Sequence, residues 1–184
     1  MKTKWEILAF LACFLILLLV VVLVAVLGDW QIFDENGTYL STAVFDFWSI
    51  GHLLAGMGIF MFIFTIYFII KNVDKNENAP SALVPPTSKN MLICWLITLG
   101  VALLWELIEN TLLFALEVKG KLDSIINAST DIIIWSIGGL GAWYLTHLMF
   151  VSKDYIHAYY LYTIINLFTF FILFIIFGYM TYEL

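Results

Sequence analysis

The feature that most constrains this chain is a series of five long apolar stretches, at residues 5–28, 47–70, 91–116, 126–151 and 155–180. Each can cross the hydrocarbon core of a bilayer, which is about 30 Å thick and takes about 20 helical residues. Charged residues make up only 12% of the 184 residues. Soluble domains carry about 25%, so too few polar side chains remain here to cover a soluble surface. The sequence therefore predicts one all-α domain, a bundle of about five transmembrane helices.

The lysines predict how the bundle is oriented. Six of them fall on one side of the predicted membrane, namely Lys2, Lys4, Lys71, Lys75, Lys89 and Lys153. The other side carries only Lys119 and Lys121. Because basic segments stay in the cytoplasm, this distribution predicts a multi-pass cell-membrane protein with a cytoplasmic N-terminus and an external C-terminus. The segment 71–90, rich in Asn and Pro, is predicted to be a flexible cytoplasmic loop.

Partners are constrained by the same composition. The chain has eight basic residues against fourteen acidic ones, which gives no basic patch for a nucleic acid to bind. The lipid bilayer is the expected partner. A homo-oligomer, or a place among the subunits of a larger membrane complex, remains open.

Acidic and amide side chains recur inside the third and fourth stretches, where each costs free energy unless it is paired. In the third stretch, Glu106, Glu109 and Asn110 are spaced i, i+3 and i+4 and so share one helix face. Leading into the fourth stretch, Asp123, Asn127 and Asp131 are spaced i, i+4 and i+8. They are expected to share one face of a continuous helix.

The second stretch brings two further polar residues to the same level. Asp46 and His52 lie at its start, the end that faces the same side of the membrane as the end of the third stretch and the start of the fourth. Since consecutive spans alternate in direction, this holds whichever way the protein is inserted. The sequence thus predicts one polar site near the outer face.

The same residues carry a resemblance to a known family. W-E-L-I-E-N at 105–110 and D-S-I-I-N-A-S-T-D at 123–131 resemble the W-E-(I/L)-(I/V)-E-N and G-D-S-(I/V)-(I/L)-N-S-x-x-D segments of an uncharacterised bacterial membrane family, domain of unknown function 2585. D-F-W-S-I-G-H at 46–52 resembles its D-W-Y-x-F-S-H segment. More distantly, the order of His, Glu and Asp-x-x-x-Asn resembles VanZ-like proteins. The resemblance spans roughly residues 46–141, with Ala55 in place of a second family His, and implies a membrane fold without an assigned reaction.

Three interpretations of the polar residues remain open. They could hold helices together in a structural or accessory subunit, through hydrogen bonds that average about 0.6 kcal/mol each. They could form a site that binds or acts on a lipid or lipid-linked phosphate. They could also relay protons in a small transporter. Five carboxyl groups without any Arg exceed what packing needs, which favours the second interpretation.

That interpretation assigns roles to eight residues. The candidate catalytic residues are Glu106, Asp131 and His52. The candidates for substrate binding are Asn110, Asn127 and Asp46. The candidate metal ligands are Glu106, Glu109, Asp123 and Asp131, because oxygen-rich sites suit a hard divalent cation such as Mg²⁺, Ca²⁺ or Mn²⁺.

Other residues carry packing predictions. Gly138, Gly139 and Gly141, with Gly56 and Gly58, would permit helices to approach closely. Asn166, a lone polar residue in the fifth stretch, is predicted to form a hydrogen bond with a neighbouring helix. Tyr155, Tyr159, Tyr160 and Tyr162 predict an aromatic belt at the membrane interface.

Overall fold

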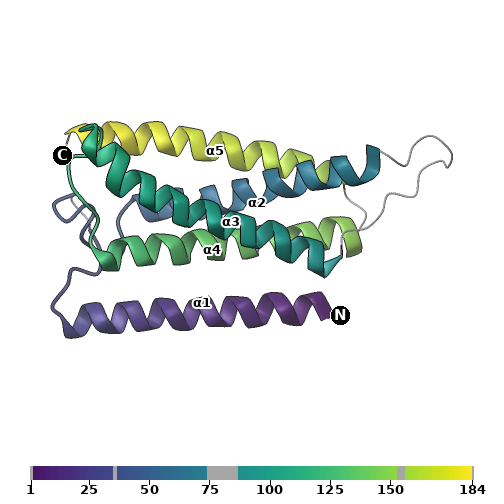
Figure 1. Ribbon diagram of the computed structural model, residues 1–184, viewed down its shortest axis with the longest axis horizontal. Helices are drawn as coiled ribbons and strands as arrows, with labels where there is room; N and C mark the ends of the chain where they lie inside the picture. The colour runs from purple at the N-terminus through teal and green to yellow at the C-terminus, as the bar shows by residue number, and fades with distance from the viewer. Residues whose placement is uncertain (1, 35–36, 74–86, 153–155, 184) are drawn as a thin grey trace.

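The computed structural model describes residues 2–34, 37–73, 87–152 and 156–183. Its five helices are α1 (Lys2–Leu27), α2 (Trp48–Val73), α3 (Ser88–Ile108), α4 (Ile125–His147) and α5 (Ile156–Glu183). Two π-helical turns, Glu109–Leu113 and Leu148–Ser152, prolong α3 and α4. All five helices run along the long axis of the molecule (Figure 1). The predicted all-α bundle is confirmed.

Each helix is long and apolar enough to cross a membrane. The spans are Ile7–Leu27, Trp48–Lys71, Ser88–Leu113, Ile125–Phe150 and His157–Thr181. They lie within a few residues of the predicted stretches, and the chain is a multi-pass membrane protein. Of the predicted 71–90 loop, residues 74–86 lie outside the described part of the chain.

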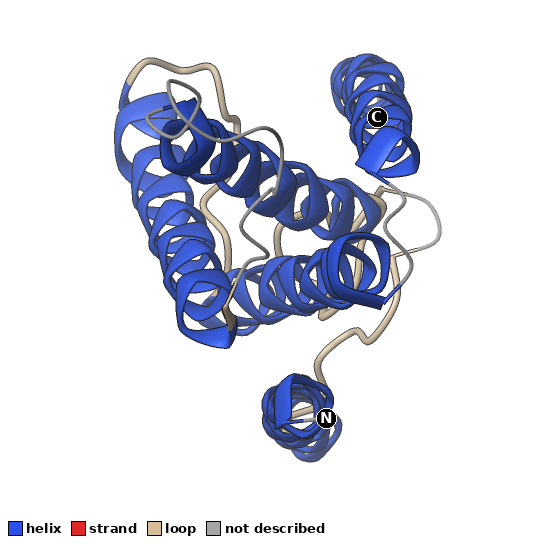
Figure 2. Cartoon of the chain, turned by 90° about the vertical axis from the view of Figure 1, so that its right-hand side faces the viewer, coloured by secondary structure: helices blue, strands red, loops and turns tan. Residues whose placement is uncertain are grey.

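The bundle has a compact centre and two outer helices. Helices α2, α3 and α4 pack against one another, while α1 packs on α4 and α5 packs on α2. Viewed end-on, α1 and α5 stand at the periphery (Figure 2). The α4 span is the most buried of the five and the α1 span is the least buried. In a bilayer most apolar side chains of α1 therefore face lipid, while Ile7, Phe10 and Phe14 pack on the core around α4.

The contact between α2 and α4 depends on two glycines. A Cβ atom added at Gly138 would lie 2.1 Å from the Leu53 carbonyl oxygen, and one added at Gly56 would lie 2.0 Å from the Trp135 carbonyl oxygen. Both obstacles are backbone atoms, which no change of rotamer can move. The predicted close approach is confirmed for these two positions. At Gly141 nothing lies within 4 Å, so this glycine plays no such part.

Helix α4 begins later than the acidic spacing suggested. Ser124 is its N-cap, and the Ser124 hydroxyl accepts a hydrogen bond from the Asn127 amide at 3.1 Å. Asp123 precedes this cap and is not part of the helix, so the prediction of one continuous helical face through Asp123 is wrong. Helix α4 begins at this cap because the Ser124 side chain satisfies a backbone donor of the first turn. Asn127 and Asp131 remain one turn apart inside α4.

Polar side chains join α5 to α2. Asn166 donates a hydrogen bond to the Leu54 carbonyl at 3.1 Å, which confirms its predicted interhelical role. Tyr159 donates to the Met61 carbonyl at 2.7 Å and is fully buried. The predicted interfacial belt is therefore wrong for Tyr159, which lies in the bundle core.

Candidate functional site

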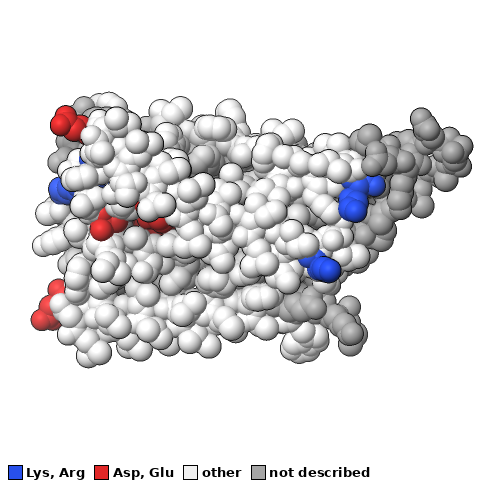
Figure 3. All heavy atoms as spheres, viewed as in Figure 1, with Lys and Arg blue, Asp and Glu red and all other residues white. Residues whose placement is uncertain are grey.

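The predicted polar site lies at one end of the bundle. The end of α3 and the starts of α2 and α4 meet there, opposite the end that holds the N-terminus (Figure 1). Acidic side chains gather at this end, and one group of them shows in the seam between α3 and α4, surrounded by atoms of uncharged residues (Figure 3). At this level, acidic groups thus reach a surface that is made mostly of uncharged residues.

The deepest part of the site is a cluster of His52, Glu106 and Asp131, here called the inner triad. Each residue comes from a different helix of the compact centre, α2, α3 and α4 respectively. One ligand atom from each lies within 4.8 Å of those of the other two. The three residues are 8%, 7% and 3% exposed. The triad therefore joins three spans at a point shielded from solvent and lipid.

Hydrogen bonding within the inner triad is incomplete. Among the described residues, Glu106 Oε1 and Asp131 Oδ1 are buried without a hydrogen-bond partner. His52 Nε2 lies 3.6 Å from Asp131 Oδ2, too far for a good hydrogen bond. Most buried polar atoms in proteins are paired, and each unpaired one calls for an explanation such as an ion or a water. Two such acceptors meet here beside an imidazole.

A second cluster lies nearer the surface. Glu106, Glu109 and Asp123, here called the outer triad, also place one carboxylate oxygen each within 4.8 Å of one another. Glu106 belongs to both triads. Lys119, from the connection between α3 and α4, donates to Glu109 Oε1 at 3.0 Å and also to Asp123 Oδ2. Burial disfavours the charged form of Lys119, but the carboxylates of Glu109 and Asp123 outweigh it and raise the pKa of Lys119 above its usual value.

Asn110 fixes Asp123 against the end of α3. It lies in the π-helical turn Glu109–Leu113, and its Nδ2 donates to Asp123 Oδ2 at 2.8 Å. Its Oδ1 accepts from the Asp123 amide at 2.8 Å. The amide nitrogen and the amide oxygen of Asn110 thus both bond to Asp123. Its Nδ2 also lies 3.4 Å from Glu106 Oε2. Such π-helical turns are frequent at functional sites. Here the turn positions Asp123, which lies outside α4, through the side chain of Asn110.

Asp46 and Asn127 tie the 28–47 loop to the helices. Asp46 caps α2, because its Oδ1 accepts from the Trp48 amide at 2.9 Å while its own amide donates to Ser49 Oγ at 3.3 Å. Asn127 Nδ2 donates to the Ala43 carbonyl at 3.0 Å and to Asp46 Oδ2 at 3.5 Å. Burial raises the pKa of Asp46, although backbone hydrogen bonds favour its ionised form. These two residues have the contacts of loop anchors.

Similarity to known proteins offers no second source of information on the site. No family model matches the chain, and neither curated proteins nor solved structures match it. The resemblance to the bacterial membrane family therefore stays a prediction. What the site can do follows from its geometry.

The structure divides the eight predicted residues into two groups. Five of them form the two triads: His52, Glu106, Glu109, Asp123 and Asp131. The three predicted to bind substrate, Asn110, Asn127 and Asp46, are engaged with loops and neighbouring acids.

Lys119 is a site residue that the predicted set omits. It stands outside every span, and the signal in the sequence was its i, i+4 spacing from Asp123. That spacing would have indicated an ion pair only if the connecting segment were known to turn back onto α3.

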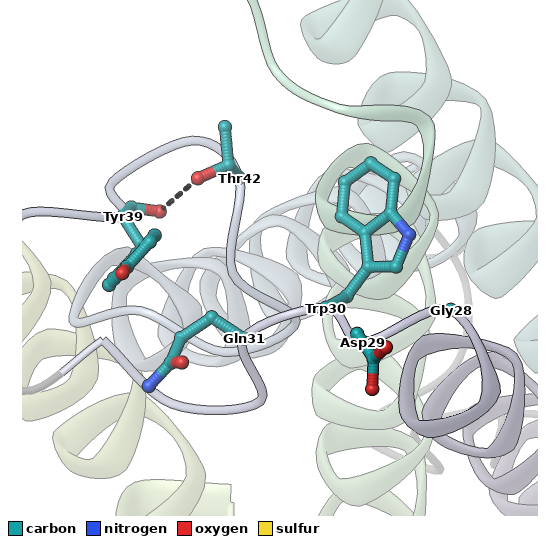
Figure 4. Close-up of a pocket in the computed structure, with 6 residues that line it drawn as sticks. All are labelled: Gly28, Asp29, Trp30, Gln31, Tyr39 and Thr42. Atoms are coloured by element: carbon teal, nitrogen blue, oxygen red, sulfur yellow. Dashed lines mark hydrogen bonds between the residues drawn. The ribbon is translucent and has the colours of Figure 1, made fainter.

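A separate open hollow on the molecule includes no residue of the two triads. It is lined by Gly28, Asp29, Trp30, Gln31, Tyr39 and Thr42 (Figure 4). The Thr42 hydroxyl donates to the Tyr39 carbonyl at 2.9 Å across one edge of the hollow. None of the eight predicted residues lines it, so the hollow is not the predicted site.

Proposed function

We propose that this membrane protein binds a hard divalent cation, Mg²⁺, Ca²⁺ or Mn²⁺, in the inner triad and presents it to the phosphate of a lipid or lipid-linked substrate. The observation that carries the proposal is a pair of buried oxygens beside His52, Glu106 Oε1 and Asp131 Oδ1, which no described residue pairs. A cation bound between them would satisfy both oxygens at once. Carboxylate oxygens with one imidazole nitrogen suit such ions, and Mn²⁺ accepts the nitrogen most readily.

The depth of the triad supports a substrate at the membrane interface. His52 lies four residues into its span, Asp131 six residues into its span, and Glu106 seven residues before the end of its span. At a rise of 1.5 Å per residue these offsets are about 6, 9 and 10 Å. Offsets of this size would put the site in about the first third of a hydrocarbon core about 30 Å thick, counted from the end where the three residues lie, and within reach of the headgroup level.

The chemistry follows from this position. A cation held by His52, Glu106 and Asp131 would polarise a phosphoryl oxygen and stabilise the charge that develops on it. The three residues then act as ligands, while Asp46, Asn110 and Asn127 hold the surrounding loops in place. This assignment gives six of the eight predicted residues a part in one site.

The second candidate is a structural or accessory subunit of a membrane complex. It is supported by the hydrogen bonds of Asn110, Asn127 and Asp46, which hold helices and loops together. The same experiment separates the two candidates, since an accessory subunit needs neither cation nor phosphate.

The test is thermal unfolding of the purified protein in detergent, with a chelator or with Mg²⁺, Ca²⁺ or Mn²⁺, each with and without a polyprenyl phosphate. We expect a cation to raise the melting temperature, since a ligand at 100 times its Kd stabilises the folded state by about 2.7 kcal/mol. The polyprenyl phosphate should raise it further only when the cation is present. The matched control is the polyprenol without phosphate, which should add nothing. Equal effects of the two lipids, independent of cation, would favour the accessory subunit.

We also propose that the N-terminus is cytoplasmic and the C-terminus external, as the distribution of lysines supports. In a background with Cys13 and Cys94 replaced by Ala, a cysteine introduced at Tyr39 or Gly120 should react with an impermeant thiol reagent from outside. One introduced at Lys89 should react only after the cytoplasmic side is opened. The reverse pattern would invert the orientation, and labelling of Tyr39 and Lys89 from one side would contradict five spans.

A further inference from the structure

We infer that the outer triad is a second cation position, in which the Lys119 ammonium is a built-in counter-ion that a second divalent cation displaces. The inference rests on the proposed function, because it takes the inner triad as the first position. It adds a two-cation site and a residue that controls its filling.

Lys119 already occupies the place of a cation. Its Nζ contacts two of the three outer carboxylates, Glu109 at 3.0 Å and Asp123. Its side chain is 13% exposed and that of Asp123 is 5% exposed, so this is a shielded ion pair. Asn110 donates to the same Asp123 oxygen that Lys119 contacts. Asp123 is therefore held in position to bind positive charge, whichever cation supplies it.

Glu106 connects the outer triad to the inner one. Its Oε1 is unpaired among the described residues although the residue is only 7% exposed, and each triad includes one of its oxygens. A carboxylate shared between two ligand sets is suited to bridge two ions, which lie about 3.5–4 Å apart in two-metal sites that act on phosphates. A buried carboxylate that is shared with the inner triad, and is incompletely paired among the described residues, distinguishes this cluster from an ordinary group of acids.

Lys119 can leave without unfolding a helix. It lies in the connection between α3 and α4, next to Gly120, which has nothing within 4 Å of its Cβ position. Withdrawing the side chain breaks its contacts with Glu109 and Asp123 and no helical hydrogen bond. The charges left behind are the ones that a divalent cation would neutralise.

The test counts bound Mn²⁺ per chain by equilibrium dialysis of the full-length protein in detergent. Lys119→Met should bind a second ion, at least ten times more tightly than the wild type does. Lys121→Met is the matched control, because Lys121 is an exposed lysine two residues away, and it should behave as the wild type. Adding Glu109→Gln to Lys119→Met should remove the second ion and leave the first.

The outcomes separate this inference from the proposed function. One ion in the wild type with no second ion in Lys119→Met would contradict the inference alone, including the case in which the single ion merely binds more tightly. No ion in either protein would contradict both.

A measurement on the wild type covers the case in which Lys119→Met fails to fold. Mn²⁺ should increase the reaction of Lys119 with an amine-acylating reagent, read by mass spectrometry, while Lys121 serves as the internal control. Unchanged or lower reactivity of Lys119 at saturating Mn²⁺ would overturn the inference.

Discussion

Asp131→Asn should abolish the stabilisation of the protein by divalent cations while leaving its fold intact. Asp131 is 3% exposed and one of its oxygens has no partner among the described residues, so the change removes an uncompensated buried charge at almost constant shape. Removing such a charge relieves a desolvation cost of several kcal/mol per ion. Without cation the variant should therefore melt at or above the wild-type temperature. With Mn²⁺ it should lose the gain of about 2.7 kcal/mol expected for an ion at 100 times its Kd.

The measurement is the melting temperature in detergent with Mn²⁺ and with a chelator, for the wild type and three variants. Glu106→Gln should behave as Asp131→Asn does, because Glu106 belongs to both triads. Asp29→Asn is the matched control, since Asp29 is an exposed carboxyl in the separate hollow and should leave the cation effect unchanged. If Asp131→Asn keeps the full effect of Mn²⁺, the inner triad does not hold the ion.

Gly138→Ala should strongly destabilise the bundle. The added Cβ would lie 2.1 Å from the Leu53 carbonyl oxygen, so α4 must move away from α2. Overpacking costs about 1–3 kcal/mol and occasionally more, and this overlap with backbone belongs at the upper end of that range. The same movement separates His52 from Asp131, so the cation effect should fall together with the stability.

Unfolding of Gly138→Ala in detergent, followed by helical circular dichroism, measures this effect. Gly141→Ala is the control on the same helix, because nothing lies within 4 Å of its Cβ position. Alanine is favoured over glycine in a helix by about 1 kcal/mol, so the control should equal or slightly exceed the wild type. Equal stability of the two variants would show that α2 and α4 do not pack as described.

The helices and the level of the site could be predicted from the sequence because both depend on local properties. The length of an apolar stretch determines whether it can span the membrane, and the helical rise determines how deep a residue lies. Alternation of the spans then brings His52, Glu106 and Asp131 to one level. That the three side chains meet at one point depends in addition on the close contact of α2 and α4 at Gly56 and Gly138.

The remaining features depend on contacts that no spacing specifies. Asp123 lies before α4 because the Ser124 cap, whose hydroxyl accepts a hydrogen bond from the Asn127 amide, decides where the helix begins. Lys119 joins the site because the connection after α3 turns back over Glu109. Tyr159 is buried because α5 turns that face toward α2, and depth along a helix does not determine which way a side chain points.

The central claim is that one cation binds between His52, Glu106 and Asp131. Pulsed electron paramagnetic resonance of Mn²⁺ bound to the purified protein tests it most directly, because the method detects nitrogen coordinated to the metal. We predict a nitrogen coupling from the His52 imidazole that disappears in His52→Gln, while Mn²⁺ remains bound through the two carboxylates. Bound Mn²⁺ without nitrogen coupling in the wild type, or no bound Mn²⁺ at all, would contradict the claim.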